Sequence, residues 1–498
     1  MSDGAAARSG PLVLVFGASG YVGSHLVRAL LDTGAQVRAA ARHRGVLEAR
    51  GWSHAELVEA DALQPDTLPG ALAGVDTAYY LVHSMAAGRD FGALDLKAAG
   101  HFADAAARAG VRRIVYLGGL APPDATSEHL VSRKQTGDRL RAGTVAVTEI
   151  RAGVIVGAGS AAYEVIRDLV YHLPVMLTPR WVRSRSVPIA LPNLIEYLIR
   201  VPQLAQTAGQ IYDVAGPEVL SYEQLMRQFG EVVGKRPWIV PVPVLSPRLS
   251  SYWLGLVTAV PSNIARALIQ GLKHDILADD TALRALVPQR LLGFREAVAA
   301  ALEAERSQTV AARWTEGAFR LRRFRHDVAF YAKRASASTR TSASPSAVWA
   351  VVTRLGGKQR YFYMNWIWSL REAIDWLAGG RGFTRGRREG GELRLGDTID
   401  YWTVVGIEAQ RQLTLDFGLK APGVGILEFD IVPEAAGTRL GLTAYWHPEG
   451  VWGLMYWWLL VPFHLFLFEG MTRAIARRAE ALEATGVSAA TTAASESR

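Results

Sequence analysis

The chain has 498 residues, enough for two or three domains of ordinary size. Half of its residues are hydrophobic and 20% are charged, a balance that excludes a largely disordered protein. It has no cysteine, which excludes disulfides, thiolate nucleophiles and cysteine-ligated metal sites and favours a reducing compartment. The net charge of +9 suits anionic ligands or an acidic membrane surface, but no pattern indicates nucleic-acid binding. Because the apolar run Leu12–Phe16 is too short for a secretory signal, we expect a cytoplasmic protein.

The first half of the chain alternates short apolar runs with longer segments rich in alanine and leucine. The apolar runs predict strands at Leu12–Phe16, Gln36–Ala41, Glu56–Ala60, Thr77–Val82, Arg113–Leu117 and Val145–Arg151. The segments between them, such as Tyr21–Asp32, Leu94–Ala109 and Ser132–Arg141, predict helices. This alternation is typical of βαβ units, so we expect an α/β domain with a doubly wound parallel sheet over residues 1–305.

The composition changes after residue 305, which divides the chain into further regions. A basic stretch predicts a linker at 306–334, and a second, α+β domain is expected at 335–485. There Ser344-Pro345 is typical of a helix start, and a long helix is expected at Phe463–Leu482. Four strands are expected at Thr398–Val405, Gln412–Phe417, Gly425–Val432 and Arg439–Tyr445. The low-complexity residues 486–498 predict a disordered tail.

A glycine-rich loop, Gly17-Ala18-Ser19-Gly20-Tyr21-Val22-Gly23, joins the first expected strand to the first expected helix. One glycine permits a tight turn, another lets backbone amides approach a pyrophosphate, and the last allows close packing of helix on strand. The positive end of the helix dipole then faces the phosphates. In this context the loop predicts a dinucleotide-binding site. The alternative is an ordinary glycine-rich turn.

The loop also carries a family resemblance. It resembles the GxxGxxG loop of extended and atypical short-chain dehydrogenases/reductases, including NmrA-like members, and the resemblance extends over about 300 residues. The other segments that carry it are VEADALQPDTL (58–68), YYLVHSM (79–85), VRRIVYLGGL (111–120), IRAGVIVGAGS (150–160) and YDVAGPEVLSYEQL (212–225). The resemblance implies a Rossmann fold that binds a nicotinamide dinucleotide, with Gly17, Ser19, Gly20, Tyr21, Val22 and Gly23 at the phosphates.

The end of the second strand indicates which dinucleotide is bound. NAD-binding loops usually have a carboxylate there for the ribose hydroxyls, but this chain has Arg42-His43-Arg44. A guanidinium suits a 2′-phosphate, so we favour NADP(H) over NAD(H), with Arg42 as the contact. The alternative is a solvated basic edge. The resemblance further implies that Asp61-Ala62 approaches the adenine and that the backbone of Leu81, Val82 and His83 borders the nicotinamide ribose.

The usual catalytic residues of that family are missing. The expected serine position has Leu117-Gly118-Gly119-Leu120, and no Tyr-x-x-x-Lys follows. His129 and Arg133 have the same i, i+4 spacing, which places both side chains on one helix face. Arg133 is therefore a candidate for holding the ribose, and His129 for acid–base work, because the unperturbed pKa of histidine lies near neutrality. His83 or Tyr80 is a candidate assistant.

Two functions of different classes remain open. The first is an NADP(H)-dependent oxidoreductase that acts on an apolar carbonyl, enone or quinone-like substrate. The second is a non-catalytic NADP(H)-binding sensor or structural protein. The missing serine and tyrosine weaken the first, but hydride transfer needs only positioning and proton delivery. The sequence shows no metal-binding pattern, and it does not indicate the oligomeric state.

The second domain resembles the helix-grip fold of START-type lipid carriers and birch-pollen-allergen-like proteins. More specifically, it resembles a domain of unknown function appended to bacterial atypical short-chain dehydrogenases, on GDTIDYWTV (396–404), the strand 429–432 and LLVPFHLFLFEGM (459–471). The resemblance implies an apolar cavity for a lipid or quinone-like ligand, which the aromatic residues of this half are candidates to line. These are Tyr361, Phe362, Tyr363, Trp366, Trp368, Trp376, Tyr401, Trp402, Trp446, Trp452, Trp457 and Trp458. Plain core packing is the alternative.

The segment Val451–Phe468 has no formally charged residue over eighteen positions, near the lower limit of a membrane span. Gly453, Pro462 and His464 interrupt it, and Glu469 follows at once. We therefore favour peripheral membrane contact by this segment over a true span.

Overall fold

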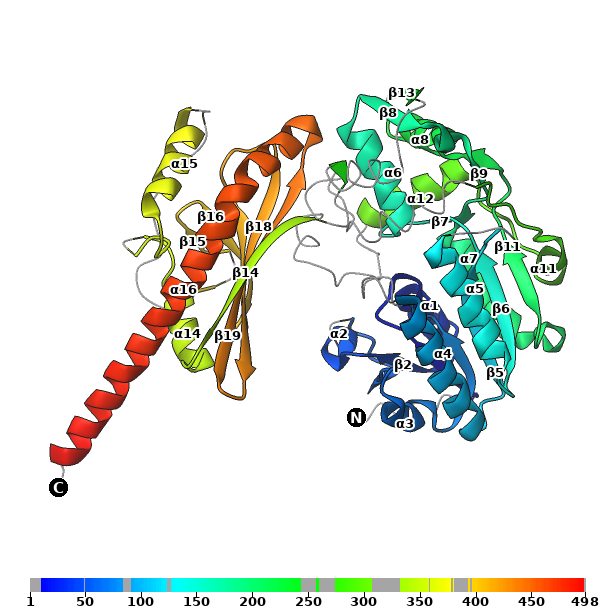
Figure 1. Cartoon of the computed structure of the whole chain (residues 1–498), viewed down its shortest axis with the longest axis horizontal. Helices are drawn as coiled ribbons and strands as arrows, with labels where there is room; N and C mark the ends of the chain where they lie inside the picture. The colour runs from blue at the N-terminus through cyan, green and yellow to red at the C-terminus, as the bar shows by residue number, and fades with distance from the viewer. Residues whose placement is uncertain are drawn as a thin grey trace, which may run out of the picture. The chain divides into compact units, whose positions relative to one another are not determined.

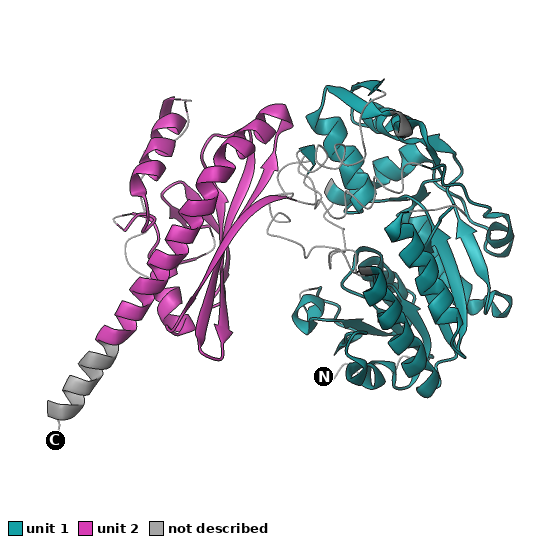
Figure 2. Cartoon of the chain, viewed as in Figure 1, with its two compact units in different colours: residues 1–315 teal, residues 316–498 magenta. Residues whose placement is uncertain are grey.

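The computed structural model describes residues 10–48, 50–83, 91–122, 127–242, 257–258, 274–306, 332–357, 359–377, 379, 393–394 and 396–496. The chain divides into two compact units, residues 1–315 and 316–498 (Figure 2). The division falls in the predicted linker 306–334, most of which lies outside the described residues. The first strand of the second unit, β14, begins at Lys333, just before the predicted domain start.

The first unit is built on a seven-stranded parallel sheet of order β11-β6-β5-β4-β1-β2-β3 (Figure 1). Its strands are β1 (Leu12–Phe16), β2 (Gln36–Ala41), β3 (Ala55–Glu59), β4 (Val75–Tyr80), β5 (Arg113–Gly119), β6 (Ala146–Ala152) and β11 (Ile211–Val214). The helices that follow these strands include α1 (Tyr21–Asp32), α2 (Arg44–Glu48), α3 (Leu68–Leu72), α4 (Phe91–Arg108), α5 (Glu128–Arg141) and α7 (Leu191–Arg200). The predicted α/β class and doubly wound sheet are confirmed.

Helices cover both faces of this sheet because alternate residues of each strand point to opposite sides. Val15 packs with the side chains of α1 and α7, whereas its neighbours Leu14 and Phe16 pack with those of α3 and α4. Tyr79 and Tyr80 divide in the same way. The strand order reverses between β1 and β4, so the carboxyl ends of these strands flank the place where such sheets bind ligands.

Smaller elements complete the first unit. The strands are β7 (Ile155–Val156), β8 (Val175–Pro179), β9 (Arg185–Ser186), β10 (Ile189–Ala190), β12 (Leu220–Ser221) and β13 (Trp238–Val242). The helices are α6 (Ala161–His172), α8 (Tyr222–Val232), α11 (Thr281–Leu286) and α12 (Phe294–Arg306). Arg167 of α6 is fully buried and pairs with Glu164 at 3.5 Å and with Glu305 of α12 at 3.4 Å. This network holds α12 against α6.

The second unit has a six-stranded antiparallel sheet of order β14-β19-β18-β17-β16-β15. Its strands are β14 (Lys333–Thr341), β15 (Thr398–Ile399), β16 (Trp402–Glu408), β17 (Gln412–Phe417), β18 (Gly423–Glu434) and β19 (Gly437–Pro448). Its helices are α14 (Pro345–Val352), α15 (Asn365–Leu377) and α16 (Gly450–Glu496). Side chains of α14 and α16 share one core with Leu415, Phe429 and Leu442 of the sheet. The predicted helix start is present, since the Ser344 hydroxyl accepts the amide of Ala347. Side chains of 486–498 lie outside the described residues, so the predicted tail stays a prediction.

Candidate functional site

The loop after β1 has the close packing that a phosphate-binding turn requires. Gly17 has a φ of +93°, and a β-carbon there would lie 3.0 Å from the Leu81 carbonyl group. A β-carbon on Gly20 would lie 3.2 Å from the Gly17 carbonyl oxygen, and one on Gly23 would collide with that same oxygen. The Gly20 amide donates to this oxygen at 3.0 Å, and Gly20 is the N-cap of α1. The first turn of α1 therefore points its amides out of a loop that tolerates no side chains at these positions.

The start of α1 is held by short contacts. The Ser24 hydroxyl donates to the Gly20 carbonyl oxygen at 2.6 Å, and His25 Nδ1 lies 2.9 Å from the Tyr21 carbonyl oxygen. The Tyr21 ring lies 5.0 Å from the ring of His25, with its hydroxyl against Gly157. The aromatic ring of Tyr21 thus anchors the helix, while Ser19 and Val22 contribute backbone to the loop.

Two arginines come to the edge of this loop. Arg42 follows β2 directly and its side chain is exposed, whereas Arg44 pairs with Glu48 at 2.8 Å and donates to the Leu57 carbonyl oxygen. Arg50 donates to the Ser19 carbonyl oxygen at 2.9 Å, and burial lowers its pKa to about 10. The sequence analysis missed Arg50 because it follows the short helix α2, and no spacing rule connects it with the glycines. Positive charge therefore lies beside the loop where a 2′-phosphate would be expected.

The end of β3 has a folded turn at the predicted adenine contact. Asp61 is half-buried and accepts the Leu63 amide at 2.9 Å. Ala62 is buried, and its carbonyl oxygen lies 2.8 Å from His101 Nδ1. Beside them, the half-buried residues Leu81 and Val82 follow β4 and pack beneath Gly17. The predicted cofactor residues thus come from the carboxyl ends of β1, β2, β3 and β4, along one edge of the sheet.

His83, His129 and Arg133 are brought together at the same edge. The rings of His83 and His129 lie 6.5 Å apart, edge to face, although one follows β4 and the other lies in the first turn of α5. Arg133 Nη1 donates to the Leu117 carbonyl oxygen at 3.1 Å, and its own carbonyl oxygen accepts the Tyr116 hydroxyl at 2.9 Å. The side chain of Arg133 also fills the space over Gly119. In the segment where the resembled family has its serine, this chain therefore has Gly119, and the aliphatic part of the Arg133 side chain lies over it.

The electrostatics of His129 bear on its predicted role. Burial, and secondarily the charge of Arg133, lower the pKa of His129 to about 3. At neutral pH the imidazole is therefore neutral in this structure, and its low pKa also makes it a weak base. The acid–base role of His129 stays a prediction, and the neutral ring is suited to hydrogen bonding with a substrate.

Tyr80 lies away from this cluster, contrary to its predicted part as an assistant. It is 1% exposed and packs among Phe16, Phe102 and Tyr116 on the α4 side of the sheet. Burial raises its pKa far above the ordinary value, so its proton is tightly held. The period-two alternation of β4, which turns Tyr80 away from the strand end, explains the difference.

Apolar side chains lie next to the histidines. Leu120 and Leu130 are buried in a small cluster with Val187, Ala215 and Ile276. Leu120 follows β5, and Leu130 is adjacent to His129. Within the described part of the chain, no group of three or more histidines and carboxylates could hold a metal ion.

The aromatic residues of the second unit divide into two groups. Those buried in its core are Tyr361, Trp368, Tyr401, Trp402, Trp446 and Trp457. Those exposed are Tyr363, Trp366, Trp376, Trp452 and Trp458, and Phe362 is intermediate. The exposed members face solvent, and the predicted cavity-lining role of the aromatic residues stays a prediction. Burial against the sheet explains the first group, and the position of α15 and α16 on its outside explains the second.

Comparison with known proteins agrees with this division. Residues 17–158 match a family described as NAD(P)H-binding, and residues 326–471 match a family described as a protein of unknown function (DUF2867). None of the curated proteins compared with the chain matches it.

Solved structures share the fold of the first unit. Triphenylmethane reductase from Citrobacter sp. has 20% sequence identity and a TM-score of 0.50, covering 59% of this chain and 100% of that one. The NADPH-dependent quinone oxidoreductase QOR2 from Escherichia coli, complexed with NADPH, has 20% identity and a TM-score of 0.49, covering 58% of this chain and 98% of that one. The first unit therefore has a Rossmann-type sheet with a match to an NAD(P)H-binding family at 17–158, and the second unit contains the DUF2867 match at 326–471.

Proposed function

We propose that the first unit is an NADP(H)-dependent oxidoreductase acting on an apolar carbonyl, enone or quinone-like compound. The observation that carries the proposal is the convergence of the glycine cradle, two arginines and the His83–His129–Arg133 cluster on one edge of the parallel sheet. A β-carbon on Gly17 or Gly23 would meet backbone atoms of Leu81 or Gly17, so the tight turn of the loop depends on glycine at both positions, as in a pyrophosphate-binding turn.

The chain's own residues would divide the work as follows. The amides in the first turn of α1 would hold the pyrophosphate, because those of Gly17, Ala18 and Gly20 already donate to backbone oxygens. Arg42 would hold the 2′-phosphate. Arg133, held by the Leu117 carbonyl oxygen, would orient the ribose. When bound, NADPH would supply a hydride to the substrate carbon, and the substrate oxygen would take up a proton from solvent water. His83 and His129 would position the substrate oxygen, and the buried leucines 120 and 130 would keep water from that side.

Arg42 supports the choice of NADP(H) over NAD(H). Its guanidinium is exposed at the end of β2, in the place where an acidic residue would favour NAD, and Arg50 adds a second positive charge near the loop. The anionic 2′-phosphate of NADP(H) would attract both positive charges, whereas NAD(H) has no phosphate at that position.

A second candidate is a non-catalytic NADP(H) sensor. It is favoured by the neutral form of His129 and by the buried Tyr80, since neither is a ready proton donor at neutral pH. In this case the second unit would take a hydrophobic ligand and the cofactor would be sensed or structural.

Calorimetry with NADPH, NADP⁺, NADH and NAD⁺, followed by NADPH oxidation with a panel of quinones, enones and apolar aldehydes, tests both candidates. Binding with turnover supports the oxidoreductase, whereas binding without turnover on any of these compounds supports the sensor. No binding of any of the four nucleotides overturns both. Gly70→Ala, at a helical glycine with open space around it, is the matched control for loop variants.

A further inference from the structure

The helix α15 in the second unit has its polar and apolar sides reversed. Its charged residues Glu372 and Asp375 are 1% and 0% exposed, whereas Trp366 is 62% and Leu377 is 76% exposed. The buried charges are satisfied inside the unit, since Glu372 pairs with Arg360 at 3.3 Å and Asp375 accepts the Lys420 amide at 2.6 Å. A surface helix of a water-soluble protein normally presents its polar side to solvent. The solvent-exposed face of α15 is therefore apolar, as expected for a helix that contacts an apolar partner.

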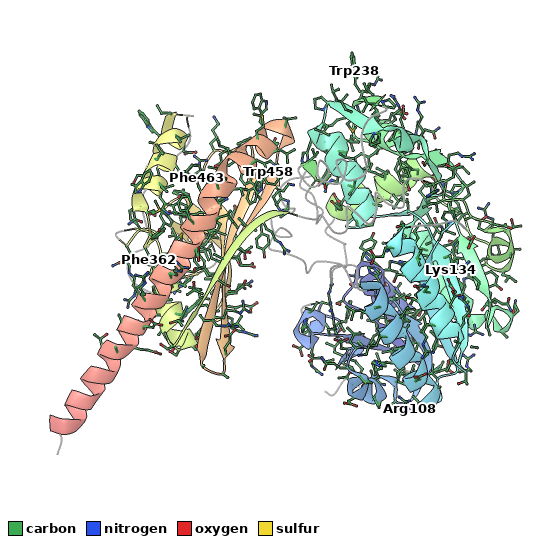
Figure 3. The ribbon with its side chains drawn as sticks, in the orientation of Figure 1. Arg108, Lys134, Trp238, Phe362, Trp458 and Phe463 are labelled. Atoms are coloured by element: carbon green, nitrogen blue, oxygen red, sulfur yellow. The ribbon has the colours of Figure 1, made fainter. Side chains whose placement is uncertain are left out.

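The first half of α16 exposes an apolar stripe of the same kind. Trp452 is 73% and Leu459 is 69% exposed, and Met455, Phe463 and Phe466 continue the stripe at helical spacing. Figure 3 labels Phe463 and Trp458 on this half of the helix. Among the described residues, α16 is long and apolar enough to cross a membrane, with a mean hydropathy of 1.6 and only 28% of its most apolar window buried.

Two contacts connect the segment that carries the first stripe with α16. Arg371 Nε of α15 donates to the Tyr456 hydroxyl of α16 at 3.0 Å, and Tyr363, just before α15, lies against Gly470. The helices are therefore antiparallel neighbours. At about 100° per residue, both exposed stripes fall on the same side of the Arg371–Tyr456 contact. We call this surface the docking face; it consists of Trp366, Leu370, Ile374, Leu377, Trp452, Met455, Leu459 and Phe463.

The other side of α16 rules out a membrane span in this fold. Trp457, Phe468 and Met471 are buried in the core of the unit with the sheet, and Trp446 Nε1 donates to the Gly453 carbonyl oxygen at 3.2 Å. A helix packed along a sheet cannot be surrounded by lipid. The arrangement instead fits a helix pair lying in the plane of the interface, with tryptophans at the level of the headgroups.

Charge around the docking face favours an anionic surface. The stripe from Trp452 to Phe466 contains no acidic residue. Beyond it Arg473, Arg477 and Arg478 are exposed on α16, and Arg473 pairs with the exposed Glu469. Lys420 is exposed beside the end of α15. In the sequence alone, Arg381, Arg385, Arg387 and Arg388 follow α15, and the whole chain has a net charge of +9.

We propose that the docking face binds the surface of an anionic lipid bilayer, so that the protein is a monotopic, peripheral membrane protein. The apolar side chains enter the headgroup–acyl boundary, while the basic residues meet anionic headgroups. This proposal concerns the second unit only and does not depend on what the first unit catalyses.

Flotation of the full-length protein with vesicles tests the proposal. Vesicles of phosphatidylcholine and phosphatidylglycerol (3:1) are expected to carry the protein upward, whereas pure phosphatidylcholine binds less and added salt weakens binding. The double variants W366E/I374E and W452E/L459E should each bind about tenfold or more weakly, because each removes two large apolar contacts. The control Trp238→Glu, at an equally exposed tryptophan of the first unit, should bind as wild type does.

A second measurement uses only the wild-type protein, so its result does not depend on whether the glutamate variants fold. Bromine-labelled lipids in the same vesicles should quench the tryptophan fluorescence of the wild-type protein. If the protein neither floats with the vesicles nor shows quenching, the proposal is overturned. It is also overturned if the protein stays in native membranes after carbonate extraction, because that result would indicate a membrane span. A dimer that becomes monomeric in both double variants, without vesicle binding by the wild type, would instead assign the face to a second copy.

Discussion

Arg133 of α5 donates a hydrogen bond of 3.1 Å to the carbonyl oxygen of Leu117 in β5, across the boundary between helix and strand. This bond holds the guanidinium over Gly119, at the edge of the sheet where the cofactor residues meet. Arg133 lies four residues after His129, and the bond limits the movement of the helix face that carries both.

Arg133→Ala is expected to weaken NADPH binding by roughly 10- to 150-fold, in keeping with about 1.5–3 kcal/mol for a hydrogen bond to a charged group. Arg133→Lys should recover part of the loss, because a lysine retains the charge but not the planar fork. Lys134→Ala, at the exposed neighbouring position (Figure 3), is the control. Calorimetry measures all three, and equal affinities for the three variants would contradict the positioning role.

Arg42→Ala should reduce the affinity for NADPH by roughly 10- to 100-fold and leave that for NADH nearly unchanged. The reason is that only NADPH carries the 2′-phosphate that an exposed guanidinium after β2 would bind. The control Arg108→Ala removes an equal charge from the end of α4. A parallel loss for both nucleotides would show that Arg42 does not discriminate between them.

Gly23→Ala should weaken the binding of every nicotinamide dinucleotide by about tenfold or more, because overpacking costs about 1–3 kcal/mol and the new methyl group meets the Gly17 carbonyl oxygen. Gly70→Ala should leave binding intact. Calorimetry reports the affinities, and circular dichroism shows whether the fold persists. Unchanged binding in a folded Gly23→Ala protein would remove the loop from the site.

The pH dependence of turnover tests the state of His129. Burial and Arg133 lower its pKa to about 3, so its imidazole stays neutral from about pH 5 to 8 and should add no inflection near pH 6.5. His129→Gln, which retains hydrogen bonding, should preserve the shape of the profile while lowering kcat. An inflection near 6.5 in the wild type that vanishes in His129→Gln would show that His129 titrates in the complex.

Glu428 should make the stability of the second unit depend on pH. Burial, and secondarily Asp430, raise its pKa to about 7 from an ordinary value of 4.5. A raised folded pKa means that the protonated form is favoured by folding, so this stability is complete below pH 4.5 and lost as pH rises through 7. Glu428→Gln should therefore unfold at higher urea than wild type at pH 8, by up to about 3 kcal/mol, and not at pH 4.5. Tryptophan fluorescence follows the unfolding, and Glu408→Gln, at an exposed position, is the control.

The strands of the first unit were predictable because buried parallel strands have strong local signals. The bounds of β1 and β2 coincide with the prediction, and the glycine loop was placed by its position between a strand and a helix. The proximity of His83 and His129 was not predictable. His83 follows β4 and His129 lies in α5, which follows β5, and the two rings lie close together because β4 and β5 are neighbours in the sheet.

The second unit shows where local signals mislead. Gly453 and Pro462 predicted an interrupted segment, yet α16 begins at Gly450 and continues through both. A β-carbon on Gly453 would collide with the Pro422 carbonyl oxygen, so this glycine serves close packing. The periodicity of the sequence did not show that α15 would bury its carboxylates. That burial depends on Arg360, which pairs with Glu372, and on the amide of Lys420, which donates to Asp375, and both residues lie outside α15.

The pairing of β14 with β19 has a consequence for synthesis of the chain. Lys333 is opposite Trp446, so the first strand of the second unit finds its neighbour only after more than a hundred further residues have been made. The β18–β19 hairpin, by contrast, pairs from Glu434 and Gly437 outward and is local. During synthesis on the ribosome, the sheet of the first unit can form before the partner strand of β14 has been made. A chain that ends before β19 would expose an unpaired strand edge, which favours aggregation.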